Sequence, residues 1–314
     1  MKRRIIILIA LCLLVSVLPS CVAERHPPTY PTTIVDDLGR NVTIPEKPAR
    51  IICLYPSFTE TLFALGLGEK VVGVTKFCDY PPEALHKEKV GGVTTVDLEK
   101  VVALNPDLVL VDARLQREVV QGLEKFGLTV VALYPENFEE ILENIRLIGE
   151  ITGQEQEARR LTADMEKRVK FITDRTKELA YSERPKVFYL TWYDPLKTVG
   201  PGTFINDLIQ LAGGKNIAAD AKQKVPAYSL ETVIARNPQV IILAGGTMTS
   251  ITVDELKALK RWQVIDAVKH GRVYSIDAAL VAGPRPRIVD GLEILAKYLH
   301  PELFPELLED IYEH

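Results

Sequence analysis

The sequence lacks the local motifs that mark most enzymes and metal sites. Its 314 residues contain no G-x-S-x-G, G-x-x-x-x-G-K-[ST] or G-x-G-x-x-G pattern, which argues against a nucleophile elbow, a phosphate-binding loop and a dinucleotide fold. The histidines show neither H-E-x-x-H nor any other local ligand spacing. We therefore predict no catalytic residues and no metal site, and we expect the five histidines to be solvated: His26, His86, His270, His300 and His314.

Cysteine is scarce. Of the four cysteines, Cys12 and Cys21 lie near the amino terminus, which leaves only Cys53 and Cys78. These two are too far apart in the sequence to form a metal knuckle. A pair of cysteines in an oxidising compartment can form a disulfide. Cysteine is also often buried as a small apolar residue. We expect the two to be buried separately, with a disulfide as the alternative.

The chain has fewer basic residues than acidic residues. The chain has 38 lysines and arginines against 42 acidic residues, a net charge of −4, and three of the cations are Lys2, Arg3 and Arg4. This balance argues against a nucleic-acid partner and against adhesion to anionic lipid through protein charge. With 47% hydrophobic and 25% charged residues, the chain is otherwise an ordinary globular sequence with room for two cores.

The first 20 residues have the pattern of a signal peptide. The basic residues precede an apolar run over residues 5–18, which is shorter than a membrane-spanning helix. The following Leu18-Pro19-Ser20-Cys21 resembles a lipobox, which implies cleavage before Cys21 and lipid attachment to its sulfur. Residues 21–33 would then be a proline-containing tether. The alternatives are an ordinary secretory signal with an incidental cysteine, and a retained membrane anchor.

A long stretch without glycine or proline occupies the middle of the chain. It runs over residues 155–180 and carries apolar residues three, four or seven positions apart: Ala158, Leu161, Met165, Val169, Ile172 and Leu179. This spacing predicts one amphipathic helix within residues 154–181. At ~1.5 Å per residue, such a helix is roughly 38 Å long.

One β/α module occurs twice, once on each side of this stretch. Residues 97–111 are DLEKVVALNPDLVLV and residues 229–243 are SLETVIARNPQVIIL. We expect each helix to end at Asn-Pro, because a residue before proline avoids the α conformation. Alternating strands and helices predict an α/β fold of two Rossmann-like lobes with parallel sheets, residues 34–153 and 182–314, joined by the long helix. The alternative is a single large domain.

Two local patterns in the first lobe give specific expectations. Residues 36–40 separate two short β-rich segments, which predicts a β-hairpin. Ser57 and Glu60 have the spacing of a capping box and are expected to start a helix over residues 58–65. Ligands of parallel sheets bind at the carboxyl ends of the strands, so the gap between the lobes is the predicted site.

Several aromatic and arginine residues lie at or just beyond these strand ends, just before the repeated helix, or at the start of the last helix. Aromatic rings suit a large flat or partly apolar ligand, and guanidinium groups suit carboxylates or phosphates. The candidates are Tyr55, Phe77, Tyr80, Trp192, Tyr193 and Tyr228, with Arg114, Arg285 and Arg287. Seven of them are our predicted ligand contacts: Tyr55, Phe77, Tyr80, Arg114, Trp192, Tyr193 and Arg287. The alternatives are hinge packing for the rings and surface salt bridges for the arginines.

The chain resembles the solute-binding proteins of cobalamin and iron-chelate ABC importers in three places: residues 50–84, residues 199–220 and both copies of the module. The resemblance spans residues 34–299 and implies a bilobal binding protein without enzymatic activity, whose interlobe helix restricts closure. In cobalamin-binding relatives, rings press on the corrin from both lobes, and Phe77, Trp192 and Tyr193 match those regions. Residues 91–95 contain no ring, and Ala227 stands where such a relative has tryptophan.

The resemblance implies an extracytoplasmic, lipid-anchored or periplasmic monomer that delivers a metal chelate to an ABC permease dimer. A corrinoid such as cobalamin is the first choice, and a ferric siderophore or haem is the alternative. Glu99 and Glu231 match the family glutamates that meet permease arginines. Without docking, each would only complement the dipole of its helix. A secreted two-lobed enzyme and an adhesive lipoprotein are the competing classes.

Overall fold

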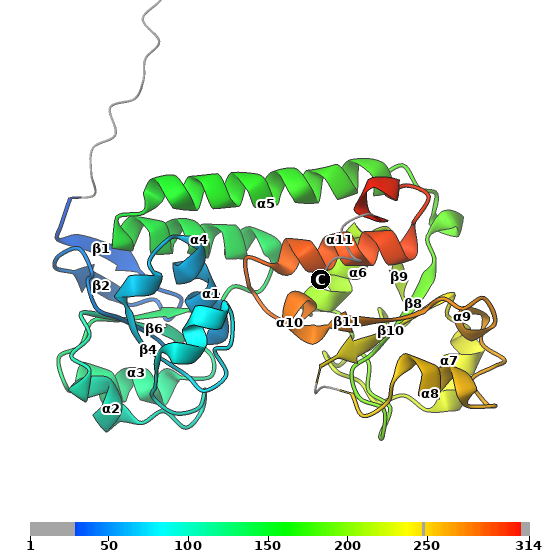
Figure 1. The fold of residues 1–314 in the computed structure, drawn as a ribbon, viewed down its shortest axis with the longest axis horizontal. Coiled ribbons are helices and arrows are strands. Elements are labelled where there is room, and N and C mark those ends of the chain that lie inside the picture. The colour runs from blue at the N-terminus through cyan, green and yellow to red at the C-terminus, as the bar shows by residue number, and fades with distance from the viewer. Residues whose placement is uncertain (1–28, 247–248, 309–314) are drawn as a thin grey trace, which may run out of the picture.

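The computed structural model describes residues 29–246 and 249–308. Two α/β lobes lie side by side beneath a layer of long helices (Figure 1). The predicted signal peptide, Cys21 and most of the predicted tether lie outside the described residues. Among the residues described, no helix has the length and apolar character needed to cross a membrane.

The first lobe contains a separate two-stranded hairpin and a five-stranded parallel sheet of order β5-β4-β3-β6-β7. Its elements are β1 (Thr32–Val35), β2 (Asn41–Ile44), β3 (Ile51–Cys53), α1 (Pro56–Ala64), η1 (Gly68–Lys70), β4 (Val71–Val74), η2 (Pro82–His86), β5 (Glu88–Lys89), α2 (Leu98–Ala103), β6 (Leu108–Asp112), α3 (Arg117–Glu124), β7 (Val130–Leu133) and α4 (Phe138–Thr152).

The second lobe follows α5 (Glu155–Thr176) and contains a four-stranded parallel sheet of order β11-β10-β8-β9. Its elements are η3 (Tyr181–Glu183), β8 (Lys186–Leu190), α6 (Phe204–Leu211), β9 (Lys215–Asn216), α7 (Leu230–Arg236), β10 (Val240–Gly245), α8 (Val253–Ala258), α9 (Asp266–Lys269), β11 (Val273–Asp277), α10 (Ala278–Val281), α11 (Ile288–Leu299) and η4 (Pro305–Leu308). The predicted α/β fold with two parallel sheets is confirmed.

Helix α5 connects the two lobes by packing on helices of both. It contacts α4 of the first lobe and α6 and α11 of the second, and the apolar stripe predicted from its sequence faces these helices, with Ala158, Met165 and Ile172 fully buried. The approach to α4 is close, because a Cβ on Gly149 would lie 2.4 Å from the Cβ of Ala158. A glycine is therefore required at this crossing.

The long helix is shorter at its carboxyl end than predicted. It ends at Thr176, not near residue 180. The guanidinium of Arg184 donates a hydrogen bond of 2.9 Å to the carbonyl of Thr176 and a longer one to that of Leu179. Arg184 lies beyond the helix, so its capping of these carbonyls was not visible in the apolar periodicity.

One apolar core runs through both lobes. The faces of the two sheets that pack toward the helical layer share a single buried cluster, which includes Ile51 and Leu110 of the first lobe and Val187 and Ile242 of the second. The opposite face of each sheet has a smaller core of its own. Because packed interiors resist deformation, this shared core favours a fixed arrangement of the lobes.

The two copies of the repeated module have the same structure. Helices α2 and α7 begin at Asp97 and Ser229, whose side chains accept hydrogen bonds from backbone N–H groups three residues later. Asn105 and Asn237, each directly before a proline, both adopt positive φ angles, of 46° and 44°. The predicted helix ends are thus confirmed, and the left-handed conformation that asparagine tolerates explains the residue type.

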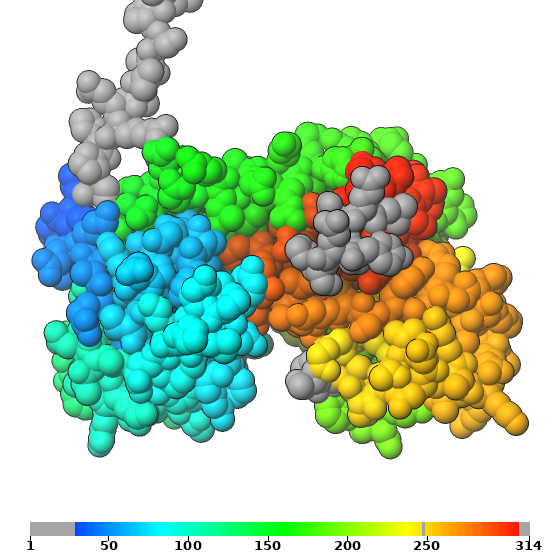
Figure 2. Space-filling model, in the orientation of Figure 1, coloured from blue at the N-terminus to red at the C-terminus, as the bar shows by residue number. Residues whose placement is uncertain are grey.

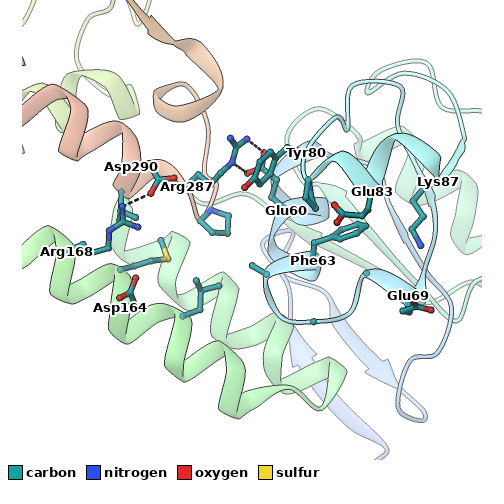
Figure 3. A pocket seen from close by; sticks show the side chains of 18 of the residues that line it. Glu60, Phe63, Glu69, Tyr80, Glu83, Lys87, Asp164, Arg168, Arg287 and Asp290 are labelled. Atoms are coloured by element: carbon teal, nitrogen blue, oxygen red, sulfur yellow. Dashed lines mark hydrogen bonds and ion pairs between the residues drawn. The ribbon is translucent and has the colours of Figure 1, made fainter. Parts of the chain in front are cut away.

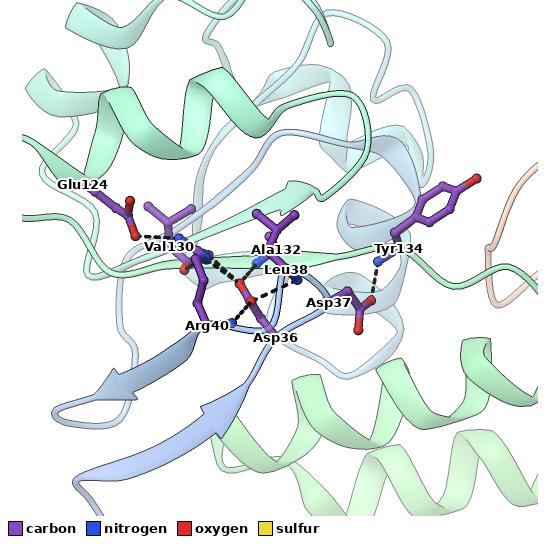
Figure 4. A network of polar contacts seen from close by, with 8 residues as sticks. All are labelled: Asp36, Asp37, Leu38, Arg40, Glu124, Val130, Ala132 and Tyr134. Carbon is purple, nitrogen blue, oxygen red and sulfur yellow. Dashed lines mark hydrogen bonds and ion pairs between the residues drawn. The ribbon is translucent and has the colours of Figure 1, made fainter.

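The predicted hairpin is also present, and a buried carboxylate attaches it to the sheet (Figure 4). Asp36 accepts hydrogen bonds from the backbone N–H groups of Leu38, Arg40 and Ala132, and it forms an ion pair with the guanidinium of Arg40. Burial alone would raise the pKa of Asp36, but these hydrogen bonds outweigh it and hold the pKa below its ordinary value. Arg40 also pairs with Glu124 of α3 at 2.6 Å.

Candidate functional site

The carboxyl ends of the two sheets face each other across a groove between the lobes, which Figure 2 shows below the helical layer. On the first lobe the groove is bordered by loops that follow β3, β4 and β6. On the second lobe it is bordered by loops that follow β8 and β11. We call this space the interlobe groove. It is the place at which ligands of parallel α/β sheets normally bind.

Phe77 gives the first lobe an exposed ring. It is 53% exposed, and the ammonium group of Lys76 lies 5.1 Å from its centroid. The loop that carries it is attached to the core by Cys78, whose sulfur lies 3.2 Å from the hydroxyl groups of both Thr59 and Thr75. A ring that remains exposed on an anchored loop has an apolar face available for a ligand.

A buried glutamine that was not predicted from the sequence joins the end of β6 to two loops of the first lobe. The amide nitrogen of Gln116 donates hydrogen bonds of 2.8 Å to the carbonyl of Leu54 and 2.7 Å to that of Val93. Its amide oxygen accepts one of 2.8 Å from the backbone N–H of Asp112. These bonds fix the end of β6 relative to the chain after β3 and to the turn before α2.

Tyr55 and Arg114 lie near each other at the floor of the first lobe. Burial raises the pKa of the Tyr55 phenol, and the charge of Asp112 raises it further. Burial also raises the pKa of Asp112, although its carboxylate accepts hydrogen bonds from the backbone N–H groups of Leu115 and Arg114. The guanidinium of Arg114 lies 4.8 Å from the ring centroid of Tyr134.

Trp192 gives the second lobe an exposed ring. It is 42% exposed, and its indole N–H donates a hydrogen bond of 2.8 Å to the carbonyl of Asp194. Backbone bridges join Trp192 to Lys197 and Lys197 to Ala227, so the loop is closed. Tyr193 and Tyr228, by contrast, pack against the second lobe's own core. The packing alternative for the rings therefore applies to both tyrosines.

The capping box predicted for Ser57 and Glu60 is wrong. Helix α1 starts at Pro56 without a side-chain cap, and Glu60 instead forms ion pairs with Arg285 and Arg287 of the other lobe. We call these three residues the interlobe ion cluster. The Glu60 side chain is 2% exposed, against 18% for Arg285 and 21% for Arg287. Pairing with residues more than 220 positions away cannot be read from a local pattern.

The predicted ligand residues Tyr80 and Arg287 lie next to each other. The Arg287 guanidinium carbon is 3.4 Å from the ring centroid of Tyr80, and its Nε and Nη2 donate hydrogen bonds of 2.9 and 3.1 Å to Glu60. Both the N–H edge and the flat face of the Arg287 guanidinium therefore already have protein partners. A second ion pair between the lobes, Lys224 to Glu136 at 3.6 Å, is more than half exposed and contributes little.

A cavity of about 750 Å³, which we call the flank cavity, opens at the side of the molecule where α1 approaches α5 and α11 (Figure 3). Its lining includes Phe63, Leu161 and Met165 together with Glu60. Of the seven predicted ligand contacts, only Tyr80 and Arg287 line it. The other five do not line it, and Arg114 lines a smaller cavity of about 250 Å³ together with Asp37 and Tyr134.

The predicted docking glutamates occupy equivalent places but differ in their surroundings. Glu99 and Glu231 are each the second residue of a short helix, α2 and α7, and both are exposed. Glu99 has no ion pair among the described residues, whereas Glu231 is paired with Arg261. Hydrogen bonds from its own backbone, from Arg261 and from Ser229 lower the pKa of Glu231.

Within residues 29–246 and 249–308, no group of three or more His, Cys, Asp or Glu side chains could hold a metal ion. Cys53 and Cys78 are both buried and free, as expected. Burial raises the pKa of the Cys53 thiol well above its ordinary value, and the neighbouring Cys78 raises it further.

The expectation of solvated histidines holds for His86 and His270 and is wrong for His300. His300 is buried at the end of α11, where its Nε2 lies 3.2 Å from the carbonyl of Gly213 and its Nδ1 lies 3.3 Å from Glu302. It therefore packs the end of this helix against the turn after α6. His26 and His314 lie outside the described residues.

Two α/β lobes with parallel sheets on either side of a groove have the architecture of a bilobal solute-binding protein. A model of the periplasmic binding protein family matches residues 51–280. The chain therefore belongs to this family, and it is a solute-binding protein, not an enzyme.

Individual relatives agree with this assignment. The chain is 35% identical to the uncharacterized ABC transporter substrate-binding lipoprotein YvrC of Bacillus subtilis (strain 168), over 98% of this chain and 100% of the relative. It is 30% identical to the vitamin B12-binding protein of Vibrio cholerae serotype O1, over 81% of this chain and 90% of the relative. The apo structure of the periplasmic heme-binding protein RhuT from Roseiflexus sp. RS-1 is similar, with a TM-score of 0.71, 28% identity, and coverage of 81% of this chain and 98% of that one.

Proposed function

We propose that this chain is the extracytoplasmic substrate-binding component of an ABC importer, and that it captures a metal chelate, a corrinoid in first place, in the interlobe groove. The observation that carries this proposal is the pair of exposed rings on opposite lobes, Phe77 and Trp192. A flat macrocycle has two large apolar faces, and a groove with a ring on each side suits them. The name of the Vibrio cholerae relative supports a corrinoid.

Haem is the second candidate, because the similar Roseiflexus protein is described as heme-binding. A ferric siderophore is the third, and the arginines at the groove floor suit the anionic groups that such chelates carry. Tyr55, Phe77, Arg114 and Trp192 are the main proposed contacts. Tyr80, Tyr193 and Arg287 are proposed as weaker contacts, because each of them already has a protein partner.

The proposed partner is a permease dimer that docks on Glu99 and Glu231, one on each lobe. Both side chains are exposed and lie at matching positions of the repeated module. Glu231 would have to exchange Arg261 for a permease arginine, whereas Glu99 has no ion pair to give up within the described residues. Docking of the binding protein as a monomer is therefore expected to start at the first lobe.

We also propose lipid attachment at Cys21, in agreement with the name of the Bacillus subtilis relative. Cys21→Ser should release the protein from the membrane fraction, and mass spectrometry of the wild type should show a mature chain that begins at a lipidated Cys21. A wild-type chain that still carries the residues before Cys21 would refute the anchor.

The ligand itself is tested with the soluble chain of residues 25–314. Calorimetric titration with cyanocobalamin, haemin and a ferric siderophore should give saturable binding of one of them at one site. Trp192→Ala is the matched variant that should weaken this binding. If none of the three compounds binds, the proposed function is wrong.

A further inference from the structure

The flank cavity has the size and the mixed lining of a small-molecule site. Its volume is about 750 Å³, and pockets that hold small ligands commonly measure roughly 300–1,000 Å³. Apolar side chains reach it from three helices: Phe63 of α1, Met165 of α5 and Val289 of α11. Neither Phe77 nor Trp192, the rings proposed for the chelate, lines it. The cavity therefore offers apolar surface away from these two rings.

The arginines that line the flank cavity already have acidic partners. Arg168 forms ion pairs of 2.6 Å with both Asp290 and Glu293. Asp290 also acts electrostatically on Arg287, whose direct partner is Glu60. Three guanidinium groups and three carboxylates thus balance one another: Arg168, Arg285 and Arg287 with Glu60, Asp290 and Glu293. This network leaves no net charge for a ligand.

The other charged groups of the lining are mainly acidic. Asp164 of α5, Glu69 of η1 and Glu83 of η2 are exposed and have no ion pair within the residues that the structure describes. Against them stand the ammonium of Lys87 and the imidazole of His86, so the acids are in excess whether or not His86 is protonated. Figure 3 shows carboxylates on opposing walls of the cavity. A hollow with an excess of one charge attracts ligands of the opposite charge.

The ring of Phe63 already lies near a cation. The ammonium of Lys87 is 5.9 Å from the ring centroid, and a cation within about 6 Å of an aromatic face is attracted to it. The ring also lies directly against the backbone of Gly68, because a Cβ on Gly68 would be 2.6 Å from a ring carbon. The cavity thus combines a supported aromatic ring with unpaired carboxylates, which together suit an organic ammonium ion.

We infer that the flank cavity is a second binding site and that it takes an organic cation, an amine or a quaternary ammonium compound with an apolar body. Phe63 and Met165 contact the apolar body, and Asp164 and Glu83 are the carboxylates for the ammonium. The lining belongs to the first lobe, to α5 and to the start of α11. A bound cation therefore contacts both lobes and should raise the melting temperature of the protein. The inference does not depend on which chelate the interlobe groove binds.

Three matched probes test this inference: tryptamine, tryptophol and indole-3-propionate. They share an indole ring with a two-carbon chain and end in an ammonium, a hydroxyl and a carboxylate. In calorimetric titrations of the wild type, tryptamine should bind about tenfold more tightly than tryptophol, as expected for a charge-assisted contact combined with an aromatic face. Indole-3-propionate should bind most weakly. Raising the salt concentration should narrow these differences.

Variants of the cavity wall show where the amine binds. Asp164→Asn and Glu83→Gln keep the shape of each side chain and remove its charge, so each should reduce the preference for tryptamine over tryptophol, and the double variant should lose most of it. Glu118→Gln, at an exposed position of α3 that does not line the cavity, is the matched control and should keep the full preference. Ala64→Trp places a large side chain on the wall and should weaken the binding of both compounds.

Several results would overturn the inference and leave the chelate proposal intact. They are a wild type that does not bind tryptamine, equal affinities for tryptamine and tryptophol, and a preference that survives in the double variant. Tryptamine binding that is lost in Trp192→Ala but kept in Ala64→Trp would place the amine in the interlobe groove and would also overturn it. Unchanged melting temperatures of the variants, measured without ligand, show that a lost preference reflects the cavity and not the fold.

Discussion

The interlobe ion cluster makes a strong prediction about stability. In Glu60→Ala, two guanidinium groups that are about four-fifths buried lose their shared carboxylate. Breaking a buried ion pair costs about 3–5 kcal/mol, and the partial exposure of both arginines allows some rehydration, so we expect a loss of ~3 kcal/mol in the free energy of unfolding. For a protein stabilised by about 5–15 kcal/mol, this is a large fraction.

Urea denaturation at neutral pH measures this loss. Glu83→Ala is the matched control, because Glu83 lines the same flank cavity, is exposed and has no ion pair among the described residues. It should change the free energy of unfolding by less than about 0.5 kcal/mol. A Glu60→Ala variant as stable as this control would refute the reasoning.

A compensating variant separates the loss of a pair from the loss of packing. Replacing all three charged groups, as in Glu60→Leu with Arg285→Met and Arg287→Leu, leaves no buried charge without a partner. Such replacements of buried ionic clusters are often neutral or stabilising. The triple variant should therefore be more stable than Glu60→Ala. If it is less stable, the cluster contributes through more than charge balance.

Three further predictions concern other parts of the chain. The pKa of Asp36 is depressed in the folded state, so its stabilising effect is present above the unfolded-state pKa of ~3.9 and disappears as the pH falls through the folded-state value. In a pH series of denaturation curves, the wild type should therefore lose stability in acid more steeply than Asp36→Asn does. Phe77→Ala and Trp192→Ala should each weaken chelate binding by on the order of 2 kcal/mol in calorimetry, with little change in melting temperature, and unchanged affinity would remove that ring from the site. Glu99→Arg combined with Glu231→Arg should leave chelate affinity unchanged and reduce stimulation of the importer's ATPase by ~tenfold or more, whereas normal stimulation would end the docking proposal.

The parts of the fold that the sequence predicted well are those that depend on neighbours in the chain. The repeated module, its Asn-Pro ends and the apolar stripe of α5 are local patterns, and the structure has all three. Their physical basis lies within a few residues, in backbone sterics and helical periodicity.

The parts that the sequence did not predict depend on partners that are distant in the chain. Glu60 fits a local capping box, yet its partners are Arg285 and Arg287 in the other lobe. Gln116 gives no local signal, because the carbonyls that it binds belong to other loops. The burial of His300 likewise depends on the turn at Gly213. Long-range polar pairing of this kind follows from the assembled fold and not from periodicity.

The candidate site likewise contains some features that the sequence predicted and others that depend on residues far apart in the chain. The rings of Phe77 and Trp192 could be proposed because strand ends are visible in the sequence, and the structure leaves both exposed. The pairing of both Arg285 and Arg287 with Glu60 could not be predicted, since it joins residues that are far apart in the sequence.

The central claim, that a chelate binds between two lobes of fixed arrangement, is tested most directly by hydrogen–deuterium exchange with and without saturating ligand. We predict protection on both sides of the interlobe groove, in residues 75–80 and 112–116 of the first lobe and 191–197 of the second. Amides of α4 and α5 should exchange as before, because these helices already share one core with both lobes. Protection confined to the lining of the flank cavity, or to one lobe, would contradict the account.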